Sequence, residues 1–169
     1  MTVKDLERLF DYGYWANKKV LTVASQLTPE QLTHTVAGSY GSVRNTMVHM
    51  LSAEWGWLDR CGGPQRGPAL KPEDYPTIEP LVERWNTVER HMREFLANLT
   101  DADLTRRVEF KNPRGETRSM VLGEALQHAA NHGVHHRGQV ALLLRALGQV
   151  PGNFDLLFYD AEQSRVPAW

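Results

Sequence analysis

The stretch MVLGEALQHAANHGVHHRGQVALLLRAL, residues 120–147, decides the fold of this chain. Its apolar residues recur in steps of three and four, which is the spacing of one buried face of a helix. These residues are Leu122, Ala125, Leu126, Ala129, Val140, Leu143, Leu144 and Leu147. Gly148 follows directly and Pro151 lies beyond it, a combination that commonly ends a helix. We therefore predict one long helix over residues 120–147.

Three further long helices are predicted upstream, over residues 3–27, 43–61 and 78–97. The first repeats apolar residues at helical spacing along its whole length. Ser42 and Thr77 stand directly before the second and third of these helices, where an N-capping hydroxyl is expected. Pro80 is tolerated because it falls in the first helical turn.

The segments between the helices also carry signals. The sequence LTPEQL, which begins at Leu27, predicts a short helical turn with Thr28 as N-cap and Gln31 completing a capping box. LTDADL repeats its shape from Leu99. Residues 106–120 alternate in polarity around NPRG and predict a small hairpin or an extended arm. The apolar tail FDLLFY, residues 154–159, is expected to dock on the helices.

The longest irregular stretch, CGGPQRGPALKPEDYP at residues 61–76, separates two similar halves of the chain. Each half has a long helix, a short turn and a second long helix. Four long helices in this order predict an all-α, four-helix bundle with a long crossover between the second and third helices. With 169 residues, the chain is expected to form one domain over residues 1–169.

The composition excludes several classes of function. The 19 basic and 20 acidic residues leave a net charge of −1, so a nucleic-acid partner is not expected. No apolar run reaches the length of a membrane span, so no membrane partner is expected. The start of the chain has no signal-peptide pattern, and the single cysteine, Cys61, fits a reducing compartment. We therefore expect a cytoplasmic protein with a small-molecule substrate.

Four of the seven histidines lie between His128 and His136. At about 100° per residue, His136 lies about 20° and His132 about 60° from the centre of the apolar stripe. His128 and His135 lie about 100° and 120° from it. His132 and His136 therefore enter the core together, and their i, i+4 spacing lets two imidazoles converge on one metal ion.

Burying two imidazoles without partners costs free energy, which favours a metal over an ordinary pair of helical histidines. Gly133 stands where a metalloprotease helix carries its glutamate, so that class is excluded. An open catalytic site usually has three protein ligands. The candidates for a third are His34 in a turn, His91 on a charged helix face, and His49 among small and polar residues. Periodicity alone leaves His49 either exposed or on the wall of a cleft.

Three motifs, in this order along the chain, resemble the DinB/YfiT-like family of metal-dependent enzymes. They are DYGYWANKKVL at 11–21, SVRNTMVHMLSAEWGWLDR at 42–60 and NHGVHHRGQV at 131–140. The resemblance implies that His49, His132 and His136 bind a divalent metal. It also implies the bundle with its crossover, and a homodimer.

Other residues in these motifs have less definite roles. Arg137 and Gln139 are expected either to orient a ligand histidine or to face solvent, and His128 is the one rival ligand. His128 and His135 are candidates for the site entrance. Packing is the expected role of Trp15, Asn17, Trp55 and Trp57. Cys61 has no neighbouring base that would make it a nucleophile.

The family resemblance implies a thiol-dependent S-transferase, in which a metal-activated thiol such as bacillithiol or mycothiol attacks an electrophile. Two alternatives stay open. One is a hydrolase that uses metal-bound water. The other is a non-catalytic, stress-associated bundle with a structural or vestigial site. Zinc and nickel are ranked ahead of iron and copper, although histidine ligands suit all four metals.

Overall fold

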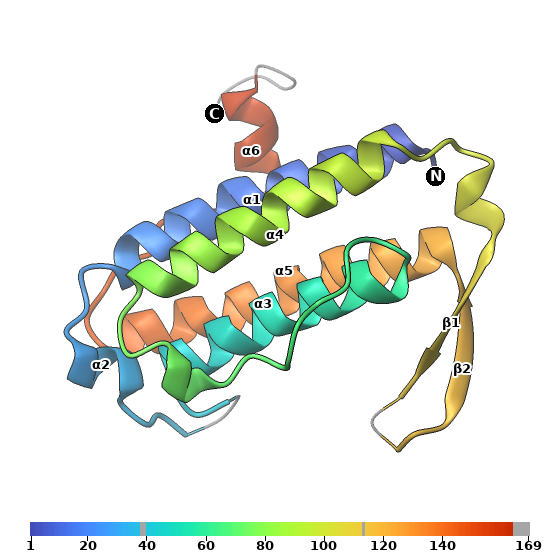
Figure 1. Ribbon diagram of the computed structural model, residues 1–169. Coiled ribbons are helices and arrows are strands. Elements are labelled where there is room, and N and C mark those ends of the chain that lie inside the picture. The colour runs from blue at the N-terminus through green and yellow to red at the C-terminus, as the bar shows by residue number, and fades with distance from the viewer. Residues whose placement is uncertain (38–39, 113, 164–169) are drawn as a thin grey trace.

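The computed structural model describes residues 1–37, 40–112 and 114–163. Four long helices make up the bundle: α1 (Val3–Ala24), α3 (Val43–Arg60), α4 (Glu79–Ala97) and α5 (Leu122–Ala146). Figure 1 shows α1 beside α4 in one layer and α3 beside α5 in the other. The crossover after α3 returns along the bundle, so that α3 and α4 run in the same direction while α5 runs opposite to them. The predicted all-α bundle is confirmed.

Several short elements decorate the bundle. The helix α2 (Pro29–Thr33) lies where the short turn was predicted, and a 3₁₀ turn, η2 (Asp103–Thr105), occupies the repeated motif. A second 3₁₀ turn, η1 (Pro72–Asp74), lies in the crossover. The predicted hairpin consists of the antiparallel strands β1 (Arg107–Lys111) and β2 (Thr117–Val121). Because β2 extends to residue 121, α5 starts at Leu122 rather than at the predicted residue 120.

Most of the predicted helix caps are confirmed. Thr28 and Gln31 form the capping box of α2. The Ser42 hydroxyl accepts a hydrogen bond from the backbone N–H of Asn45 at the start of α3. The prediction of Thr77 as a cap is wrong, because α4 begins after Ile78 with no side-chain cap. The Thr77 side chain instead hydrogen-bonds to Glu79, which lowers the pKa of that carboxyl.

The core runs the length of the bundle in two apolar clusters. Val20, Leu51, Trp85 and Leu144 belong to the cluster that joins all four helices toward the end of the bundle where α2 lies. Leu6, Leu58, Met92 and Leu126 are members of the second cluster, near the hairpin. Within the described residues, no helix combines the length and the apolar character needed to cross a bilayer.

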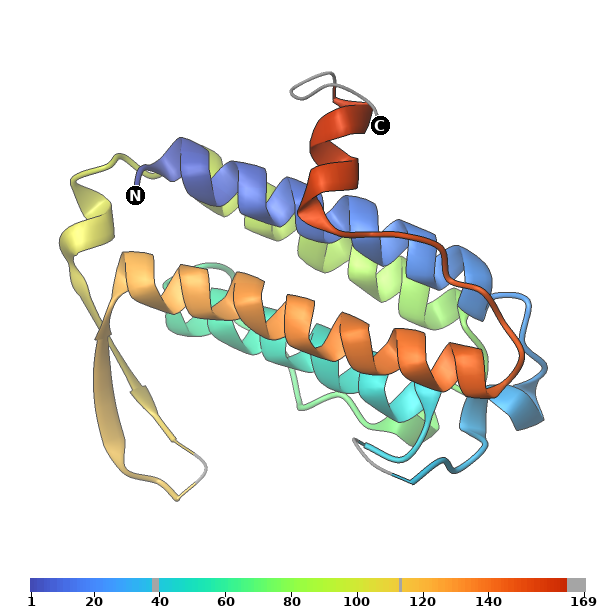
Figure 2. The same ribbon diagram turned by 180° about the vertical axis from the view of Figure 1, so that it is seen from behind.

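The tail docks on α1, as predicted, and part of it is helical, which the sequence pattern did not indicate. Figure 2 shows the chain running back along α1 after α5 before it forms α6 (Leu156–Glu162). Tyr159 packs against Trp15, with ring centroids 5.6 Å apart, and Asp160 forms an ion pair with Arg8. The Trp15 indole N–H also donates to Glu162 at 2.6 Å. Packing is therefore confirmed as a role of Trp15.

Two nearby leucines on α5 test the packing of this helix. Leu144 is completely buried, whereas Leu142 is 69% exposed. We expect Leu144→Ala to lower the free energy of unfolding by about 2–5 kcal/mol, because it removes buried methyl groups and leaves a cavity. Leu142→Ala is the matched control, with an expected change within about 0.5 kcal/mol. Urea denaturation measures both values, and equal losses would contradict the described orientation of α5.

Candidate metal centre

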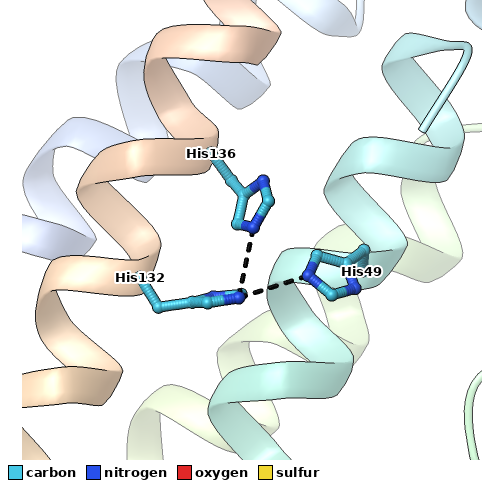
Figure 3. Close-up of side chains that lie close together, drawn as sticks. All are labelled: His49, His132 and His136. Carbon is cyan, nitrogen blue, oxygen red and sulfur yellow. Dashed lines mark hydrogen bonds between the residues drawn. The ribbon is translucent and has the colours of Figure 1, made fainter. Parts of the chain in front are cut away.

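Three histidines from two helices converge in the seam between α3 and α5, as Figure 3 shows. The Nε2 atom of His132 lies 3.2 Å from Nε2 of His49 and 3.1 Å from Nε2 of His136. One ring nitrogen from each residue lies within 4.8 Å of the other two. The structure therefore brings together the three residues that the sequence analysis singled out.

The spacing of these nitrogens fits a metal ion. Three nitrogens at tetrahedral Zn–N distances of about 2.0–2.1 Å are about 3.3 Å from one another. The two shorter separations in the cluster, 3.1 and 3.2 Å, are close to that value. Small adjustments of the rings would complete the arrangement, so the three histidines are positioned to hold a divalent ion.

Each helix places its histidines for a simple reason. On α5, the four-residue spacing stacks His132 and His136 one turn apart on the same face. On α3, the residues that flank His49, Val48 and Met50, are buried at 2% and 4% exposure, which fixes the rotation of this helix about its axis. His49 is then left in the seam, half-buried and facing α5.

The electrostatics of the cluster favour neutral imidazoles. Burial, together with repulsion from His136, lowers the pKa of His49 to about 4. Burial and the neighbouring histidines lower the pKa of His132 to about 4 as well, and burial lowers the pKa of His136. All three rings are therefore neutral near pH 7, which is the form that binds metals.

Gln139 orients one of these rings. Nδ1 of His136 lies 2.6 Å from Oε1 of Gln139, an acceptor, so Nδ1 carries the proton and Nε2 keeps its lone pair. The amide nitrogen of Gln139 lies 3.2 Å from Nε2 of His135 and donates to it. Of the two predicted roles for Gln139, the structure therefore supports orientation of a ligand histidine, a common partner of metal-binding imidazoles.

Tyr40 is a site residue that the sequence pattern did not indicate, because it lies in a loop without periodicity. Its ring stacks on His49 with centroids 3.9 Å apart, and its hydroxyl lies 3.0 Å from Nε2 of His49. At 46% exposure, Tyr40 covers the cluster on its solvent side. Its hydroxyl is thus within hydrogen-bond distance of one of the converging nitrogens.

The remaining histidines lie outside the cluster. His128 and His135 are exposed beside it, with ring centroids 6.0 Å from His132 and 4.8 Å from His136 respectively. His34 caps the C-terminal end of α2, in the turn where it was expected, and is exposed. The expectation that His91 is a surface residue is wrong in part, because its Nδ1 atom is buried.

Arg137 follows a cluster histidine but is turned toward α1, away from the cluster. Its guanidinium is buried at 3% exposure and donates to Oδ1 of Asn17 at 3.1 Å. Gly13 and Gly133 leave room for it, since a Cβ atom at Gly133 would lie 3.1 Å from Nη1 of Arg137. The two expected roles, ligand orientation and solvent exposure, are therefore both wrong for Arg137. The packing role expected of Asn17 includes a buried hydrogen bond.

The half-buried carboxyl group of Glu54 faces the same region. Glu54 accepts a hydrogen bond from the Tyr14 hydroxyl at 2.8 Å, and burial raises the pKa of Glu54 to about 7. Glu54, Tyr14, Asn17 and Arg137 line a cavity of about 20 Å³, enough for one water molecule. Helical periodicity does not predict this network, because its members come from three helices.

Two tryptophans of the second motif, and the cysteine that follows this motif, behave as expected. Trp55 is part of the core, and Trp57 is half-buried against the hairpin residue Phe110, with ring centroids 5.2 Å apart. Cys61 is buried, and burial raises the pKa of its thiol to about 11. A thiol that stays protonated at neutral pH is a poor nucleophile, which supports the expectation for Cys61.

Fold and site together define the class as a four-helix bundle with a candidate metal centre between two of its helices. The chain belongs to the DinB family, whose profile matches residues 1–166.

Individual relatives agree with this assignment. Protein DinB of Bacillus subtilis strain 168 is 23% identical over 162 residues, which cover 90% of this chain and 91% of that protein. YizA of the same strain is 24% identical over 144 residues, covering 85% and 89% of the two chains. A crystal structure of a DinB-like protein from Bacillus cereus ATCC 10987 superposes with a TM-score of 0.73 and 26% identity. The superposition covers 90% of this chain and 97% of the Bacillus cereus chain.

The raised pKa of Glu54 predicts a pH-dependent stability. Between pH 4.5 and about 7, the folded protein holds a proton on Glu54 that the unfolded chain has released. Stability from this group is complete below pH 4.5 and is lost as the pH rises through about 7. We expect wild type to lose on the order of 2 kcal/mol more than Glu54→Gln between pH 5 and 8, measured by urea denaturation without added metal. Parallel pH profiles of the two proteins would contradict a protonated Glu54.

Proposed function

We propose that this protein is a divalent-metal-dependent S-transferase that joins a low-molecular-weight thiol to an electrophilic small molecule. In this proposal His49, His132 and His136 bind the metal. The observation that carries it is the convergence of three imidazoles, with ligand atoms within 4.8 Å of one another, in a member of the DinB family.

The number of histidines supports an open site. Structural zinc sites usually close with four protein ligands, whereas catalytic sites keep one position free. Among the described residues, the group that could hold a metal here has three members, all histidines. A divalent ion on three neutral imidazoles keeps its positive charge and would lower the pKa of a thiol or water bound beside it. Zinc and nickel are our first choices, since imidazole suits both.

The proposed reaction is a displacement at carbon. A sulfur–carbon bond forms as the bond from that carbon to its leaving group breaks, and the thiol proton leaves with the departing group or to solvent. Tyr40 can orient the incoming molecule through its hydroxyl, which lies 3.0 Å from Nε2 of His49. The homodimer and the response to stress stay predictions from the family resemblance.

Removing one ligand tests the proposal. We expect His132→Ala to lose bound metal and thiol-dependent activity, because Nε2 of His132 takes part in both short contacts of the cluster. We expect little change in its melting temperature. Metal analysis by mass spectrometry and conjugation of thiols to 1-chloro-2,4-dinitrobenzene, with and without chelator, are the measurements. His128→Ala is the matched control, since it lies one turn away on α5 but outside the cluster.

Each possible result has a distinct meaning. A large fall in the melting temperature of His132→Ala would favour a structural metal site. Activity that survives complete removal of metal would overturn the proposal, and turnover that needs no thiol would indicate hydrolysis instead.

Gln139 offers a test of ligand orientation. Gln139→Leu removes the acceptor that holds the Nδ1 proton of His136, so we expect zinc affinity to fall about 10–100-fold. Competition with a chromogenic chelator measures the affinity. Gln127 is exposed on the same helix, so Gln127→Leu should leave the zinc affinity unaltered. Equal affinities of wild type and Gln139→Leu would show that the hydrogen bond has no role in metal binding.

A further inference from the structure

The face of α3 that carries His49 continues toward a pair of arginines. With 3.6 residues per turn, Gly56 and Arg60 lie on the same side of the helix as His49, and the side chains between them are small. Gly56 lies about 10 Å along the axis from His49, since each residue rises 1.5 Å. His49, Gly56 and Arg60 thus lie along one side of α3.

Two guanidinium groups meet at Gly56. A Cβ atom at this residue would lie 3.0 Å from Nη1 of Arg66 and 3.7 Å from Nη1 of Arg60. Arg66 comes from the crossover, and its Nη1 atom also lies 3.5 Å from the Ser52 carbonyl oxygen. The absence of a side chain at Gly56 thus lets a crossover arginine rest directly on α3, one to two turns from His49.

The positive charge of this pair is not neutralised by contact. Within the described residues, neither Arg60 nor Arg66 forms an ion pair, whereas Arg8 and Arg93 do. Burial and then the neighbouring Arg66 lower the pKa of Arg60, while the charge of Asp59 acts in the opposite direction. Two adjacent like charges repel each other, so an anion between them would be bound favourably.

Aromatic rings hold Arg60, and one of them also contacts His128 beside the histidine cluster. Its guanidinium lies 4.9 Å from the ring centroid of Trp57 and 5.6 Å from that of Phe110. Trp57 also contacts His128, and the centroids of these two rings lie 4.9 Å apart. Stacking of this kind orients a guanidinium while its N–H groups stay available.

We propose that Arg60 and Arg66 bind an anionic group, a carboxylate or a phosphate, on the small molecule whose reacting end lies at the three histidines. This inference rests on the proposed function and adds a substrate class to it. The planar donor fork of arginine matches both kinds of anion. The substrate is then a molecule whose negative charge lies on the order of 10 Å from its sulfur or electrophilic carbon, because His49 and Gly56 are separated by about that distance along the axis of α3.

Thiols of matched length test the charge requirement. The probes are 8-mercaptooctanoate, 6-mercaptohexyl phosphate and the neutral 8-mercaptooctanol, each titrated calorimetrically into zinc-loaded protein. We expect the affinity for at least one anionic thiol to be about tenfold or more above the affinity for the neutral thiol. The anionic thiol that binds more tightly shows whether a carboxylate or a phosphate is preferred.

Variants assign the effect to the arginine pair. The double variant Arg60→Gln and Arg66→Gln should lose about tenfold or more in affinity for the anionic thiol and leave the alcohol unchanged. Arg84→Gln is the matched control, because Arg84 also stacks on a tryptophan, Trp55, at 5.1 Å but lies on α4. Gly56→Ala should reproduce the loss by displacing Arg66. Circular dichroism melting verifies that every variant is folded.

The outcomes separate this inference from the proposed function. Equal binding of all three thiols by wild type, or equal loss for the anionic and neutral thiols in the double variant, would overturn the arginine site. If His132→Ala binds every thiol as tightly as wild type and still prefers the anionic thiols, the proposed function fails and the anion site stands.

Discussion

The packing of α3 against α5 is the contact on which the rest of this structure depends. These two helices run in opposite directions and pack more extensively than any other pair of described elements. Leu51 and Leu144, both fully buried, belong to the apolar cluster that joins them. Metal ligands tolerate deviations of only about 0.2 Å, so a shared ion is feasible only while this packing holds His49 beside His132.

Polar groups inside the bundle sit on two sides of α5. The histidine cluster faces α3, while Arg137 faces α1 and donates to Asn17. Desolvating such groups costs free energy, which hydrogen bonds and neighbouring charges offset only in part. Natural proteins keep costly interior groups of this kind mainly at functional sites. The apolar clusters at both ends of the bundle supply the stability that accommodates them.

Loops complete the site that the helices begin. Tyr40 stacks on His49 from the loop before α3, and Arg66 rests on Gly56 from the crossover. The hairpin contributes Phe110 to the aromatic group around Arg60. A rigid helical frame thus holds the three histidines, while residues from connecting segments pack around its two central helices.

The sequence by itself determined the four long helices, the crossover, the caps at Thr28 and Ser42, and the pairing of His132 with His136. All of these depend on residues close together in the chain, where helical periodicity and capping chemistry apply. His49 could be selected only through resemblance to a family, because its own helix face allowed two orientations. Tertiary structure alone decided that His49 meets His132, that Arg137 points to Asn17, and that Arg66 lies on Gly56. These contacts join residues from separate segments, and only the packing of the helices sets the distances between them.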